Sequence, residues 1–143
     1  MKNRIFIIDT NVLAAGLITV DPNSPTARIL DVMLEGTLFY LLSGELLSEY
    51  RNVLMRPKLV RLHGLNSTAI DQLLTEITAN AIWRELPAEK INQAPDPGDS
   101  HLWALLSSEP NAILITGDHL LIKNPKPQAS IISPGTWAEH FAD

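Results

Sequence analysis

The chain of 143 residues contains no cysteine. Disulfide bonds, cysteine-bound zinc and a thiol nucleophile are therefore excluded, and any metal ion has to be held by oxygen atoms or imidazole. Long hydrophobic runs are missing as well: no stretch approaches the ~20 apolar residues of a membrane span, and the N-terminus lacks the basic and apolar segments of a signal peptide. We therefore expect a cytoplasmic protein without a membrane anchor.

Positive charge is scarce, because 11 Lys and Arg residues stand against 16 Asp and Glu residues and leave a net charge of −5. Such an excess of acid normally disfavours polyanionic partners such as nucleic acid. The objection fails if four of the acids gather around divalent cations, since the remaining surface is then close to neutral. The charge balance therefore does not exclude a nucleic-acid substrate.

Apolar runs typical of buried strands alternate with segments of helical periodicity. The expected strands cover residues 4–9, 38–42, 82–86, 111–116 and 129–132. The expected helices cover residues 12–18, 24–36, 44–55, 68–80, 99–108 and a last segment from residue 133 onward. Ser24, Ser43 and Ser67 are the expected N-caps of three of them. This alternation predicts one domain, residues 1–143, of the three-layer α/β/α class with a central, mostly parallel sheet.

Two acids follow directly on buried strands. Asp9 ends the run IFIID, and Asp118 follows the run AILIT. In parallel sheets ligands bind beyond the carboxyl ends of the strands, so both carboxylates are expected at one edge, with Asn11 and Thr116 beside them. Each acid taken alone is equally consistent with a turn residue that caps the next helix.

Two further acids lie on helices. Glu49 borders the apolar stripe of the predicted helix 44–55, although an exposed helical glutamate is an equally good interpretation. Asp99 begins the predicted helix 99–108 on its apolar face, where an acid is also favoured by the helix dipole, and Asp96 competes for that role.

Four carboxylates at one edge would repel one another, and divalent cations relieve that repulsion. Ligand sets made only of oxygen select Mg²⁺ or Mn²⁺. Such ions activate water and stabilise the charge that develops on a phosphate during hydrolysis. The acids therefore favour a phosphodiester-hydrolysing site.

Four segments in this order, IIDTNVL, LLSEYRNVL, APDPGDSHLWALL and ILITGDHLL, resemble the PIN-domain family. More narrowly, the chain is similar to the bacterial toxins of type II toxin–antitoxin systems related to the VapC toxins. The resemblance implies a three-layer nuclease that cuts RNA with Mg²⁺ or Mn²⁺. It further implies a small antitoxin as partner and a homodimer.

The resemblance also assigns the site residues. The metal ligands and catalytic acids are Asp9, Glu49, Asp99 and Asp118. Asn11 and Thr116 match positions that support this cluster. Relatives often carry a further acid where this chain has Gly98, so either Asp96 takes over that role or a second ion is held weakly.

Cationic residues follow Glu49 closely in the sequence. The candidates for binding RNA phosphates are Arg51, Arg56, Lys58 and Arg61. Ordinary solvated charge after a helix is the alternative interpretation. The four histidines show no ligand spacing such as H-x-x-x-H, and none is assigned to a metal ion.

Two other functions compete with the nuclease. A phosphatase of the haloacid dehalogenase type also opens with an apolar strand and an Asp, but it needs a second Asp where Asn11 stands. The other alternative is a catalytically weak or inactive PIN fold that binds RNA or protein. The four acids argue against it, because converging carboxylates without metal cost stability.

Overall fold

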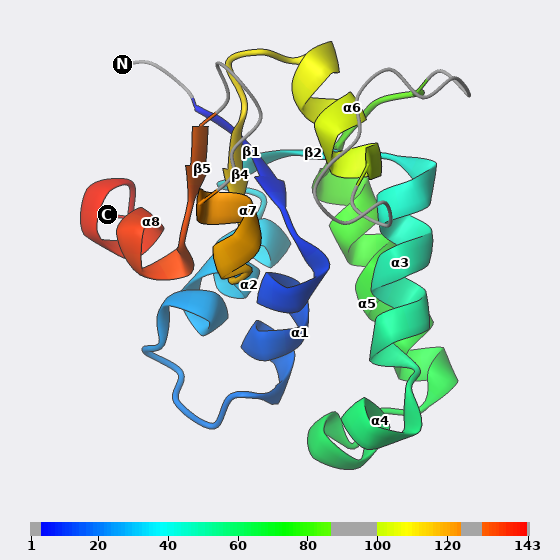
Figure 1. Ribbon diagram of the computed structural model, residues 1–143. Helices are drawn as coiled ribbons and strands as arrows, with labels where there is room; N and C mark the ends of the chain where they lie inside the picture. Colours follow the sequence, from blue (N-terminus) through cyan, green and yellow to red (C-terminus); the bar gives the residue numbers. More distant parts are fainter. Residues whose placement is uncertain (1–3, 87–99, 124–129, 143) are drawn as a thin grey trace.

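The computed structural model describes residues 4–86, 100–123 and 130–142. In this part of the chain, five strands form one all-parallel sheet with the order β3-β2-β1-β4-β5 (Figure 1). The strands are β1 (Ile5–Ile8), β2 (Phe39–Leu42), β3 (Ile82–Trp83), β4 (Ile113–Ile115) and β5 (Ser130–Ile132). The predicted three-layer α/β/α class is confirmed.

The helices are arranged around this sheet in a doubly wound pattern. They are α1 (Thr10–Ile18), α2 (Pro25–Glu35), α3 (Gly44–Leu54), α4 (Pro57–His63), α5 (Ser67–Asn80), α6 (Ser100–Ser108), α7 (His119–Lys123) and α8 (Pro134–His140). One helical layer is built from helices that contact one another: α1 packs against α2 and α3, α3 packs against α5, and α2 packs against α8. The chain then crosses from β3 to β4 on the other side of β1, and a right-handed crossover puts α6 on the opposite face.

Most helix ends lie where the sequence places them. Ser24 and Ser43 cap α2 and α3 as predicted, and Gly36 ends α2 in the left-handed conformation at φ 77°. The predicted cap of α5 is wrong by one residue, because Asn66 rather than Ser67 accepts the hydrogen bond from Ala69 N at 2.8 Å. None of the described helices is long and apolar enough to cross a membrane.

Several predicted boundaries need correction. Helix α1 begins at Thr10 and not at residue 12, because Asp9 already caps it, and β3 covers only Ile82–Trp83 of the predicted 82–86. Helices α4 and α7 were not predicted. Pro57 occupies the first turn of α4. This helix has only seven residues, none of them fully buried, and Leu59 packs partly buried against the core.

Strand β1 lies at the centre of the sheet and carries the site. Ile7 and Ile8 are fully buried, and β1 pairs with β2 on one side and with β4 on the other. Beyond its end, Asp9 N donates to Ile115 O at 3.0 Å, and the buried Tyr50 hydroxyl of α3 donates to Ile8 O at 2.6 Å. The carboxyl end of β1 is therefore held from the sheet and from the helical layer.

The strand order reverses between β1 and β4, since the chain leaves β1 toward β2 and later returns to the other side of β1. Doubly wound sheets form a crevice at the carboxyl ends of the strands where such a reversal occurs. Asp9 follows β1 and Thr116 follows β4 at this reversal.

Candidate active site

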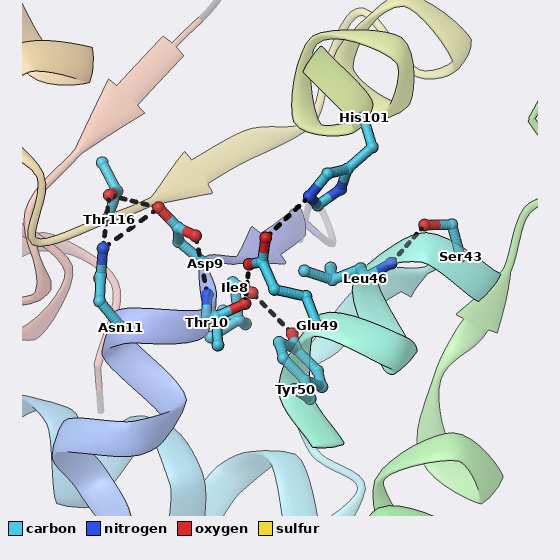
Figure 2. A network of polar contacts seen from close by, with 10 residues as sticks. All are labelled: Ile8, Asp9, Thr10, Asn11, Ser43, Leu46, Glu49, Tyr50, His101 and Thr116. Carbon is cyan, nitrogen blue, oxygen red and sulfur yellow. Dashed lines mark hydrogen bonds and ion pairs between the residues drawn. The ribbon is translucent and has the colours of Figure 1, made fainter. Parts of the chain in front are cut away.

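Asp9 is the most enclosed acid of the described residues, since the residue is only 4% exposed. Thr10 N donates to its Oδ1 at 2.8 Å, and the Thr116 hydroxyl donates to its Oδ2 at 2.7 Å. The Asn11 amide adds a longer contact to Oδ2 at 3.3 Å (Figure 2). Asp9 thus caps α1, as one interpretation of the sequence held, and also presents a fixed carboxylate at the edge of the sheet.

The pKa of Asp9 is raised above its ordinary value. Burial is the largest cause, because it disfavours the charged form, and the negative charge of Glu49 acts in the same direction. The hydrogen bonds from Thr116 and Thr10 oppose the shift without cancelling it. A cation near Asp9 would therefore stabilise its ionised form.

Glu49 lies at the margin of the core on α3, as its position beside the apolar stripe predicts, and its side chain is 31% exposed. One carboxylate oxygen accepts a hydrogen bond from the Thr10 hydroxyl, and the other lies 3.2 Å from His101 Nε2 on α6 (Figure 2). The hydrogen bond from His101 is the main cause that lowers the pKa of Glu49, while burial acts in the opposite direction. Both oxygens are consequently held in place.

Thr10 joins the two acids, because its backbone N–H binds Asp9 and its hydroxyl binds Glu49. Residues that lie far apart in the sequence thus meet at one edge of the sheet. Figure 2 shows Asp9 and Glu49 on either side of Thr10, with His101 approaching Glu49 from α6.

Asn11 and Thr116 connect the loops that follow β1 and β4. The Asn11 side chain accepts a hydrogen bond from Gly117 N at 2.9 Å, and Thr116 Oγ1 accepts one from Asp118 N at 3.0 Å. The structure thereby places both residues beside Asp9, where the sequence analysis expected supporting groups. Asp118 is half-buried and follows β4 at this same edge.

The structure brings only part of the predicted acid set together within the described residues. In residues 4–86, 100–123 and 130–142, no three Asp, Glu or His side chains are grouped closely enough to hold a metal ion. Asp96 and Asp99 were predicted as supporting residue and metal ligand, and both lie outside the described residues, as does Gly98. The described pair, Asp9 and Glu49, offers carboxylate oxygens, which fit a hard divalent cation.

His101 belongs to the site although its spacing in the sequence does not indicate it. Its side chain is 13% exposed, its Nε2 contacts Glu49, and its buried Nδ1 has no hydrogen-bond partner in the described part of the chain. A search for ligand spacing could not reveal this contact, because the two residues lie 52 positions apart on different helices. The available signal was its place in the motif APDPGDSHLWALL, directly at the start of α6.

The four predicted phosphate-binding cations lie in different surroundings. Arg51 forms an exposed ion pair with Asp71 of α5 at 2.8 Å. Arg56 lines a cleft together with Glu49 and His101. Lys58 and Arg61 are exposed on α4.

The fold and the site together define a class of protein: a doubly wound three-layer α/β/α protein with a carboxylate site where its strand order reverses. A family profile described as PIN domain matches residues 6–120, so the chain belongs to the PIN-domain family. PIN domains are generally nucleases, and they typically use divalent metal ions. A comparison with curated proteins found no match to this chain.

The contact between His101 and Glu49 should contribute measurably to folding. Because a hydrogen bond to a charged group is worth roughly 1.5–3 kcal/mol at most positions and Glu49 is partly solvated, we expect a coupling energy of about 1 kcal/mol. Urea denaturation of His101→Leu, Glu49→Leu and the double variant measures it, because leucine cannot accept the hydrogen bond. His119→Leu, an exposed position on α7, is the matched control for the histidine. Strictly additive effects of the two substitutions would contradict the contact.

The raised pKa of Asp9 predicts a specific pH dependence in metal-free protein. The folded state holds the Asp9 proton more tightly than the unfolded chain does. Protonated Asp9 therefore contributes its full share to the free energy of unfolding below the unfolded pKa, and this contribution is lost as the pH rises through the folded pKa. Relative to Asp9→Asn, the free energy of unfolding of the wild type should fall by about 1.4 kcal/mol for each pH unit that separates the folded pKa from the unfolded one. Urea denaturation of both proteins at several pH values between about pH 4 and pH 8 tests this. If the free energy of unfolding of the wild type, relative to that of Asp9→Asn, stays constant or rises with pH, the prediction is wrong.

Proposed function

We propose that this PIN-domain protein is an endoribonuclease that hydrolyses RNA phosphodiester bonds with Mg²⁺ or Mn²⁺. The observation that carries the proposal is the buried Asp9 carboxylate, which three donors orient at the carboxyl end of the central strand with Glu49 beside it. A buried carboxylate is costly unless a positive charge compensates it, and a divalent cation supplies that charge.

Asp9 and Glu49, which Thr10 links, would hold the ion. The resemblance adds Asp118, which follows β4, and Asp99, which lies outside the described residues. A bound divalent ion lowers the pKa of a water molecule and stabilises negative charge on the phosphate. The chain's own contribution is orientation: Thr116 and Asn11 fix Asp9, while Thr10 and His101 fix Glu49. Rigid support of this kind is what a metal ligand requires.

The biological setting that we propose is a toxin–antitoxin pair, with this protein as the toxin. Its support is the similarity of the four sequence segments to the toxins related to VapC. In this proposal a small antitoxin covers the acidic edge, and the nuclease forms a homodimer. An upstream reading frame for a small DNA-binding protein would agree with the pairing.

A second candidate function is a PIN fold that binds RNA or protein with little or no catalysis. The observation that favours it is Gly98, which stands where relatives often carry another acid. The burial of Asp9 favours the nuclease, because a bound cation offsets the cost of an enclosed carboxylate that the cap of α1 alone does not require to be buried.

Cleavage of a labelled RNA in the presence of Mn²⁺ distinguishes the two functions. Asp9→Asn keeps the size of the side chain but removes a negatively charged ligand, and we expect the cleavage rate to fall by at least about 100-fold. Asp31→Asn, an exposed position on α2, is the matched control and should cleave at the wild-type rate. Wild-type activity in Asp9→Asn would refute the site, and the absence of cleavage by the wild type would favour the binding module.

A further inference from the structure

A cleft of about 760 Å³ opens directly beside Glu49. It runs along α3 from Gly44 to Val53, a length of about 14 Å at the rise of an α-helix. Glu49 and His101 belong both to its lining and to the candidate active site. Its volume is in the range of pockets that hold small ligands, and one nucleotide would fit.

The charges of the cleft are separated along α3. Arg56 lies beyond the C-terminal end of the helix, whereas Glu45 lies in its first turn. Glu85 lies at the same end of the cleft as Glu45. It follows β3, whose Trp83 pairs with Leu42 at the end of β2, and the chain passes from there directly into α3. The cleft therefore offers a cation at one end, two carboxylates at the other, and Glu49 between them.

Glu85 is an exposed acid whose carboxylate accepts a hydrogen bond from its own strand segment. The indole N–H of Trp83 donates to Glu85 Oε1 at 2.7 Å, and Arg84 N donates to Leu42 O at 2.9 Å, which ties this segment to the sheet. A carboxylate held in this way repels a phosphate but accepts hydrogen bonds from the amino group of a base.

We propose that the acidic end of this cleft is a subsite for an unpaired base carrying an exocyclic amino group, with Glu85 as its acceptor, and that Arg56 binds a phosphate of the same strand. The inference rests on the proposed function, since it concerns the RNA nucleotide that flanks the cut. Cytosine presents an amino group at the position where uracil presents a carbonyl oxygen, so Glu85 should prefer cytosine. In a double-stranded RNA the amino group points into a deep and narrow major groove that side chains do not reach, so the subsite takes an unpaired base.

The test is the binding of fluorescein-labelled oligocytidylate and oligouridylate of equal length, measured by fluorescence anisotropy in EDTA and low salt so that neither strand is cut. We expect the wild type to bind oligocytidylate roughly tenfold more tightly. Glu85→Gln should bring the two affinities within about twofold of each other, because an amide both donates and accepts. Glu76→Gln on α5 is the matched exposed control and should keep the wild-type preference.

Arg56→Gln tests the other end of the cleft. It should weaken the binding of both oligonucleotides by a similar factor and reduce the salt dependence by about one counterion. Equal affinity of the wild type for the two strands, or a cytosine preference that survives in Glu85→Gln, would overturn the inference. Equal affinity combined with Mn²⁺-dependent cleavage would overturn the subsite alone, whereas binding of neither strand and no cleavage would overturn the proposed function with it.

Discussion

The structure depends on one costly arrangement, the enclosure of the Asp9 carboxylate at the end of the central strand. Burial raises its pKa, and the donors from Thr10 and Thr116 reduce that cost only in part. The surrounding fold keeps the arrangement in place, because β4 binds the Asp9 backbone and α3 binds the end of β1 through Tyr50. A fold that holds a carboxylate so firmly in a costly position is well suited to a bound cation.

The residues around the enclosed Asp9 carboxylate come from several strands and helices. Residues after β1 and β4 meet where the strand order reverses, and the side chains of Asn11 and Thr116 close that junction. Glu49 comes from a helix, and its carboxylate is positioned by Thr10 from α1 and by His101 from α6. The cleft beside Glu49 extends the site along α3 toward Arg56, so a nucleic-acid strand at the acids would contact this helix.

Strand periodicity and turn chemistry were enough to predict the parallel sheet and the places of Asp9, Asn11 and Thr116, because residues after buried parallel strands must lie at one edge. Glu49 could be predicted from its position beside an apolar stripe. His101 could not, since its contact joins two helices that only the tertiary fold brings together. Helix α4 escaped prediction because seven residues are too few to show a helical period. The ion pair of Arg51 with Asp71 depends on the packing of α3 against α5.

The most direct measurement is a calorimetric titration of the protein with Mn²⁺, carried out in parallel on the wild type and on Asp9→Asn. We expect saturable binding by the wild type and none by the variant. An ion at about 100 times its dissociation constant should stabilise only the wild type, by about 2.7 kcal/mol. No binding by the wild type, or equal binding by both proteins, would contradict a cation site at Asp9.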